Sequence, residues 1–98
     1  MTSKNTILSV ISTHKQELAA FGVKRIGLFG SYVRNEQKPQ SDIDILIDFD
    51  PEKETFDNFM NLHNYLEELF CNEKIEIITV NGLSPHIGKY ILKEVNYV

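Results

Sequence analysis

Two apolar segments with unusual polar ends constrain this chain most. Residues 24–29 are typical of a short strand and lead into a glycine-serine turn, and residues 43–49 are typical of a second strand. Asp42 and Asp44 stand at the start of that second strand. Side chains two residues apart on a strand share a face, with Cα atoms about 6–7 Å apart. The two carboxylates would repel each other beside a sheet core, so folding alone does not account for them.

The same residue types suit the binding of metal and phosphate. A divalent cation relieves the repulsion between Asp42 and Asp44, and carboxylate oxygens are preferred ligands of hard cations. Gly30 lets the backbone approach a phosphate closely, while Ser31 and the amides after it offer hydrogen-bond donors. The ordinary alternatives are a strand-to-helix turn with a capping serine and a pair of solvated acids. The combination of both features favours a nucleotide site over these alternatives.

The wider sequence context of these residues resembles a known signature. Residues 25–34 and 41–47, with Gly30-Ser31 and Asp42-Ile43-Asp44 ten residues apart, resemble the nucleotidyltransferase superfamily that includes DNA polymerase beta. Within it, the chain is similar to the minimal nucleotidyltransferases of the MntA-like group, from about residue 23 to the C-terminal helix. The resemblance implies metal-dependent transfer of a nucleoside monophosphate, AMP from ATP by default, with two Mg²⁺ ions.

The resemblance also implies a catalytic set of three acids. Asp42 and Asp44 would hold the metal, and a third carboxylate comes from a later strand, usually as aspartate. Glu76 is the only acid in the expected strand 74–80 and is therefore our candidate for metal binding and for accepting the proton of the attacking hydroxyl. Its alternative is a surface glutamate at a strand end. The extra methylene of glutamate departs from the family's pattern, and a misplacement of about 1 Å can cost on the order of 100-fold in rate.

Four residues are expected to bind the nucleotide. Gly30 and Ser31 correspond to the family's phosphate-binding pair. Arg34 follows one turn later and would contact either a phosphate or a neighbouring carboxylate. Ser41 directly precedes Asp42 and would position the nucleotide or simply end the loop.

The acceptor of the nucleotide is expected to be a protein. Many MntA-like proteins are antitoxins encoded beside a HEPN-domain RNase toxin, and they transfer AMP to a tyrosine of that toxin. The resemblance therefore implies a HEPN-type toxin as partner. Two alternatives stay open: a nucleotidyltransferase-fold module that neutralises its partner by binding alone, and a small-molecule nucleotidyltransferase subunit of the antibiotic-modifying type. Sequence does not determine whether the chain forms homo- or hetero-oligomers.

Composition narrows the class of protein. The 98 residues, 42% of them hydrophobic, predict one domain spanning residues 1–98. The net charge of −4 and the scattered basic residues make nucleic acid an unlikely main ligand. No apolar run approaches the ~20 residues of a membrane span, and the N-terminus has no signal-peptide core. The single cysteine suits a reducing compartment, so we expect a cytoplasmic protein in which Cys71 is a small buried hydrophobe.

Residue periodicity predicts an α/β fold, a small mixed β-sheet flanked by helices in the order α-β-α-β-α-β-α. The expected helices cover residues 3–21, 32–35 and 55–70, with a last helix starting at Ser84-Pro85. The expected strands cover residues 24–29, 43–49 and 74–80.

Two helices are expected to bury apolar stripes. The stripe of the helix over 55–70 consists of Phe56, Phe59, Met60, Leu62, His63, Leu66, Leu69 and Phe70. The last helix is expected to turn Ile87, Ile91, Leu92 and Val95 inward. His14 and His63 are expected to pack at the core edge. Asp48 and Asp50 are interpreted as surface charges.

Overall fold

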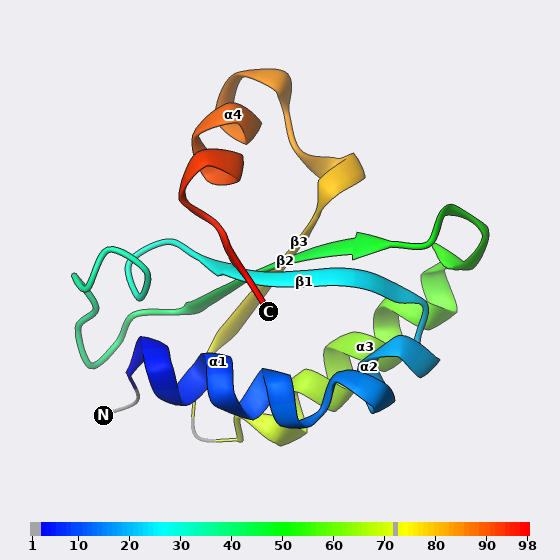
Figure 1. The fold of residues 1–98 in the computed structure, drawn as a ribbon, viewed down its shortest axis with the longest axis horizontal. Helices are drawn as coiled ribbons and strands as arrows, with labels where there is room; N and C mark the ends of the chain where they lie inside the picture. The colour runs from blue at the N-terminus through cyan, green and yellow to red at the C-terminus, as the bar shows by residue number, and fades with distance from the viewer. Residues whose placement is uncertain (1–2, 72) are drawn as a thin grey trace.

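A four-stranded mixed sheet organises the part of the chain that the computed structural model describes, residues 3–71 and 73–98 (Figure 1). The strand order is β3-β2-β1-β4. Strand β1 (Val23–Phe29) is antiparallel to both β2 (Ile43–Phe49) and β4 (Asn96–Tyr97), whereas β2 is parallel to β3 (Ile75–Thr79). The expected α/β architecture with a small mixed sheet is confirmed.

Helices cover both faces of this sheet unequally. Helices α1 (Lys4–Thr13), α2 (Lys15–Ala20) and α3 (Phe56–Leu69) lie together on one face, and α4 (Pro85–Glu94) lies on the other (Figure 1). Two single 3₁₀ turns, η1 (Pro51–Lys53) and η2 (Val80–Gly82), connect β2 to α3 and β3 to α4. The sheet is thus the middle of three layers.

The larger core fills the space between the sheet and the three helices. Successive side chains of a strand point to opposite faces, so Ile43, Ile45 and Ile47 of β2 all point the same way. They are fully buried against apolar residues of β1 and the helices. The helix residues buried there are Ile7, Ile11, Leu18, Leu62 and Leu66.

A smaller core lies on the other face, under α4. It is built on Phe29, Leu46 and Ile91, with Ile78 and Val95 packed against them. Leu46 shares its face with Asp44, because the two are separated by two strand positions. The acidic start of β2 therefore faces the same side of the sheet as α4.

The first expected helix is interrupted. Residues 3–21 form two helices because His14 leaves helical geometry, with φ −107° and ψ 19°, and its Nδ1 lies 2.8 Å from the carbonyl oxygen of Val10. The expected ends are confirmed: the Ser3 side chain caps α1 by accepting from Thr6 N–H, and Gly22 follows α2 with φ +92°. The continuous apolar periodicity across His14 concealed the break.

Two further differences concern short segments. Residues 32–35 form successive turns rather than a helix, and Asn35, with φ 58°, ends them in the left-handed region. Strand β4 was missed, because its two residues carry almost no pattern of their own. These two residues form a strand only through pairing with Gly27 and Leu28, about 70 positions earlier in the chain.

Several apolar residues expected inside lie outside. Phe56 and Met60 of α3 are 77% and 38% exposed, and Ile87 and Leu92 of α4 are 58% and 48% exposed. Each of these helices therefore buries a narrower stripe than its sequence suggests. Cys71 is exposed, so the expectation of a buried thiol is wrong. None of the helices within residues 3–71 and 73–98 is long and apolar enough to cross a membrane.

Candidate active site

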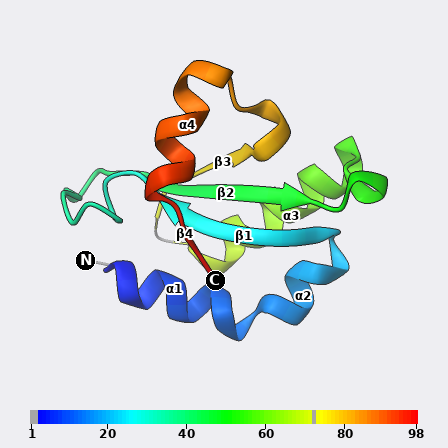
Figure 2. The same ribbon diagram turned by 45° about the horizontal axis from the view of Figure 1, so that its top comes forward.

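Sheet pairing brings Gly30 against Asp44. Phe29, the last residue of β1, is paired with Asp44 near the start of β2, so the chain leaves β1 directly beside this carboxylate. Gly30 has φ +82°, and a Cβ atom there would overlap the Asp44 carboxylate. Only glycine can adopt this left-handed backbone conformation and also let the backbone lie this close to the Asp44 carboxylate. The two motifs, which ten residues separate in the sequence, thus form one site at the end of the sheet where the loop of residues 31–42 projects (Figure 2).

The parallel pairing of β2 with β3 brings Glu76 to the same place. Asp44 and Glu76 are register partners, as are Leu46 and Ile78 two positions on. Because the second pair packs in the small core under α4, the first pair faces that side too. Asp42 precedes β2 on the same parity and is exposed. The structure therefore places all three predicted acids at the same end of the sheet.

The acids shift the protonation of Asp44. Partial burial, followed by the negative charges of Glu76 and Asp42 and a hydrogen bond to Glu76, raises the pKa of Asp44 from 3.8 to about 6. The positive charge of Arg34 opposes this rise. The environment of Asp44 therefore disfavours its ionised form.

The donor set fits a divalent cation in charge and chemistry. Three carboxylates provide hard oxygen ligands, and an added positive charge would relieve the repulsion that, after burial, raises the pKa of Asp44. Across residues 3–71 and 73–98, however, no three acid, histidine or cysteine side chains already stand as a metal-ligand group. Asp42 and Glu76 are exposed, so rotation of their side chains toward Asp44 would not disturb the core.

The predicted phosphate-binding residues occupy the turn next to these acids. Ser31 is partly buried, and its carbonyl accepts from Glu36 N–H at 2.9 Å. Arg34 donates from Nε to Glu36 at 2.7 Å and from Nη1 to the carboxylate of Glu94 at 2.9 and 3.1 Å. The neighbouring carboxylate considered as an alternative partner of Arg34 is therefore present, and there are two of them.

Ser41 has a structural task in the loop. Its Oγ accepts from Lys38 N–H at 2.8 Å, and its own N–H donates to the Lys38 carbonyl at 2.9 Å. This reciprocal pair closes the loop just before Asp42. The geometry gives the loop-ending interpretation of Ser41 direct support, whereas nucleotide contact stays a prediction.

Sequence reasoning missed Glu94. This residue ends α4, and its Oε2 accepts from the backbone N–H of Gly30 at 2.9 Å. A detectable signal was its position, because acids at a helix C-terminus oppose the helix macrodipole and need another reason to be there. That reason is the Gly30 amide and the Arg34 guanidinium.

Other charged residues have separate partners. Asp48 is not a free surface charge: it accepts two hydrogen bonds from Arg25, which also lies over the Tyr97 ring. Asp50 caps η1 by accepting from Glu52 N–H. His14 packs edge-on against Tyr65, and His63 lies 3.1 Å from Glu67. The ring contact agrees with the expected packing of His14 at the core edge, whereas the described contact of His63 is a polar one within α3.

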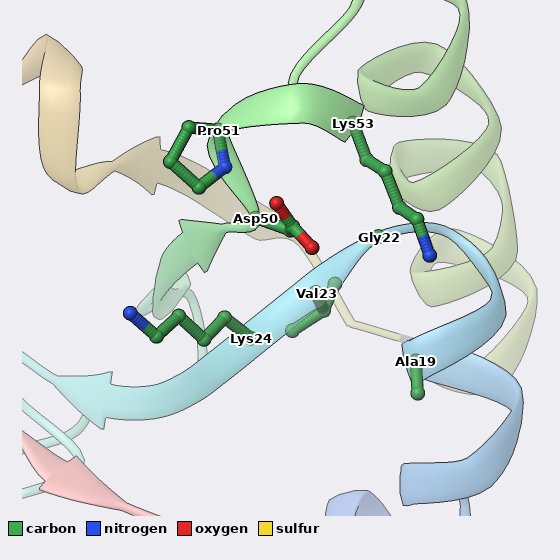
Figure 3. A pocket seen from close by; sticks show the side chains of 7 residues that line it. All are labelled: Ala19, Gly22, Val23, Lys24, Asp50, Pro51 and Lys53. Carbon is green, nitrogen blue, oxygen red and sulfur yellow. The ribbon is translucent and has the colours of Figure 1, made fainter.

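A pocket of about 300 Å³ lies at the opposite end of the sheet (Figure 3). It is lined where β1 begins and β2 ends, by Gly22, Lys24, Asp50 and Lys53 among others. The two lysine side chains extend away from the Asp50 carboxylate on opposite sides (Figure 3). The pocket contains none of the predicted site residues, so it is distinct from the acidic site.

Known proteins share both the sequence and the fold of this chain. The family described as Polymerase beta, Nucleotidyltransferase matches residues 5–98. The protein adenylyltransferase MntA of Thermococcus cleftensis is 42% identical over 99 residues, covering 100% of this chain and 98% of the relative. A candidate protein adenylyltransferase of Methanocaldococcus jannaschii is 39% identical over 100 residues, covering 100% of both.

Solved structures agree with these relatives. A candidate minimal nucleotidyltransferase superposes with a TM-score of 0.82 at 27% identity, covering 97% of this chain and 95% of that one. A toxin-antitoxin crystal structure with AMP-PNP has the same fold, with a TM-score of 0.63 at 20% identity, and covers 98% of this chain and 72% of that one. The chain therefore belongs to the polymerase beta nucleotidyltransferase family, as a minimal nucleotidyltransferase of the MntA-like group.

Proposed function

We propose that this nucleotidyltransferase transfers AMP from ATP to a tyrosine hydroxyl of a HEPN-type RNase toxin and so acts as an antitoxin. The observation that carries the catalytic part is the convergence of Gly30 and Glu76 on Asp44. The protein acceptor is supported by the T. cleftensis relative, which is named a protein adenylyltransferase and matches this chain from end to end. A structure described as the toxin-antitoxin pair MntA-HpeT shares the fold.

In this proposal the three acids hold Mg²⁺, with two ions as the family resemblance implies. Asp42, Asp44 and Glu76 are the ligands, and the bound cations would neutralise charge on the α-phosphate and on the departing pyrophosphate. The residues of the chain supply the remaining functions. Asp44 anchors the set, because it is the most enclosed of the three acids.

The phosphate turn orients the triphosphate. The backbone at Gly30 and the hydroxyl of Ser31 hold its terminal oxygens, and Arg34 adds a positive charge. The acceptor oxygen attacks the α-phosphorus in line, and the bond to the pyrophosphate oxygen breaks as the new P–O bond forms. Glu76 takes the hydroxyl proton. Such catalysis consists of positioning and charge neutralisation, which a small domain can provide.

Glu76 also motivates a second candidate function. The family usually carries aspartate at this position, so a module that neutralises its partner by binding alone would tolerate the longer side chain. The two functions differ in whether AMP becomes covalently attached.

Mass spectrometry of the toxin after incubation with this protein, ATP and Mg²⁺ distinguishes them. We expect AMP on a tyrosine with the wild type, and a loss of about 10²–10⁴-fold in rate with Glu76→Gln, because the proton acceptor is removed. Glu76→Asp should retain activity. Glu68→Gln, a charge removal on the exposed surface of α3, is the matched control and should leave the rate unchanged. Rapid transfer by Glu76→Gln would exclude Glu76 as the base, and complex formation without transfer by any variant would establish the binding-only function.

A further inference from the structure

The carboxylate of Glu94 occupies the donors assigned to phosphate. Oε2 accepts from Gly30 N–H at 2.9 Å, and both oxygens accept from Arg34 Nη1 at 2.9 and 3.1 Å. A carboxylate that is bound by one backbone amide and one guanidinium has the contacts that phosphate oxygens make. The Glu94 carboxylate is thus an anion that the chain itself supplies to these donors.

The fold holds Glu94 in this position from a distance in sequence. Gly30 and Glu94 are 64 residues apart, and the end of α4 is brought to the turn by Ile91 and Val95 in the small core. Strand β4 follows immediately and pairs with β1. The backbone of Glu94 is therefore anchored on both sides.

The side chain of Glu94 can move away from Gly30 and Arg34. It is 26% exposed, so a change of rotamer would carry the carboxylate into water without opening either core. Its place at the C-terminus of α4 is also electrostatically unfavourable, because the partial negative charge of the helix end repels it. Its present position thus depends on the contacts to Gly30 and Arg34.

We propose that Glu94 is an internal competitor of the triphosphate: it fills the phosphate site in the nucleotide-free protein and is displaced when nucleotide binds. This inference rests on the proposed function in assigning the turn to phosphate. Binding of the anion then transfers Gly30 N–H and Arg34 from Glu94 to phosphate oxygens. If the carboxylate occupies the site about nine-tenths of the time, it lowers the apparent affinity about tenfold.

The opposite interpretation is that Glu94 holds Arg34 ready for the phosphate. In that case Glu94 helps binding, and its removal weakens the site. Glu36 provides the matched control, because it also binds Arg34, at 2.7 Å from Nε, and carries the same charge, but the only described contact to Gly30 N–H is that of Glu94.

Calorimetric titration of inorganic tripolyphosphate into the folded protein tests the inference without any transfer reaction. We expect Glu94→Gln and Glu94→Ala to bind tripolyphosphate about tenfold more tightly than the wild type. The alanine variant excludes a residual hydrogen bond from the glutamine amide oxygen to Gly30, and thermal melts show that each variant is folded. Glu36→Gln should change the affinity by less than about twofold, since the Glu36 side chain forms only an exposed ion pair with Arg34 and its removal leaves Gly30 N–H bound to Glu94.

Equal or weaker binding by both Glu94 variants would overturn the inference, as would the absence of tripolyphosphate binding by every protein. A similar gain with Glu36→Gln would also overturn it, because general charge removal would then explain the effect. Parallel transfer assays with Mg²⁺ and ATP separate this result from the proposed function. Tighter tripolyphosphate binding without AMP transfer by any protein would support the inference and overturn the function.

Discussion

Gly30 combines two constraints at a single residue. Its φ of +82° lies in the left-handed region, and the space where a side chain would begin is already filled by the Asp44 carboxylate. A glycine at such a point gives the backbone a conformation and an approach that other residues cannot provide. The local glycine-serine motif is thereby connected to the acids of the next strand.

Gly30→Ala should separate a binding role from a turn role. We expect Gly30→Ala to lose about 1–2 kcal/mol of unfolding free energy, because alanine is strained in the left-handed region. Its ATP affinity should fall by much more than that of the control, because the added methyl displaces Asp44. Gly22→Ala is the matched control: its φ is +92° and its Cβ would lie 2.6 Å from Lys53 Cβ, at the other end of the sheet. Urea unfolding and calorimetric titration of Mg·ATP measure both effects. Equal ATP affinities of the two variants would show that Gly30 is only a turn residue.

At the scale of elements, the helices bury less of their apolar surface than their sequences suggest. Leu66 of α3 is fully buried, whereas Phe56 of the same helix is 77% exposed. Both belong to one expected stripe, but only part of that stripe faces the sheet. Ile87 and Leu92 show the same on α4.

Truncation of these two α3 residues should give opposite results. Leu66→Ala removes a fully buried side chain from the larger core and should cost about 2–5 kcal/mol of unfolding free energy. Phe56→Ala removes an exposed ring and should change stability by less than about 0.5 kcal/mol. Urea denaturation of the three proteins measures the difference. A loss above 2 kcal/mol for Phe56→Ala would mean that the ring is covered in solution, and a small loss for Leu66→Ala would contradict the packing of α3.

At the scale of the whole molecule, the acidic site opposes folding in the absence of cations. Three acids, Asp42, Asp44 and Glu76, lie at the same end of the sheet in a chain whose net charge is −4. Burial of Asp44, together with these neighbouring charges, raises its pKa, so the folded state retains a proton on Asp44 to a higher pH than the unfolded chain does. Stability should accordingly depend on pH in a defined direction.

The sign follows from the raised pKa of Asp44. Between 3.8 and about 6 the folded state binds more protons than the unfolded state, so the contribution of this group is full below 3.8 and is lost as pH rises through about 6. With divalent cations chelated, Asp44→Asn should gain stability over the wild type between pH 5 and pH 7.5. Asp48→Asn, on the same strand and face but paired with Arg25, should show no such gain. Urea denaturation at both pH values decides, and a gain by Asp44→Asn that is larger at pH 5 would contradict the assignment.

Much of the fold and part of the site could be predicted from sequence, since their signals are local. Alternating apolar residues identified β1, β2 and β3, and the caps Ser3 and Ser84 marked helix starts, as the structure confirms. The family and the enzyme class were inferred from a resemblance carried by residues 25–34 and 41–47, which include the glycine-serine turn and the paired aspartates, and both are confirmed. Even the position of Glu76 was inferable, because it is the only acid in its strand.

Tertiary structure alone decided the remaining features, because they depend on residues far apart in the chain. The register of β2 with β3 sets Glu76 beside Asp44, and the pairing of β1 with β2 sets Gly30 against the same carboxylate. Glu94 reaches Gly30 across 64 residues through the packing of α4, which no local pattern encodes. Sequence by itself determined which chemistry the chain carries. The folded sheet determined which residues lie together in the site, since pairing and packing energies arise only when distant segments meet.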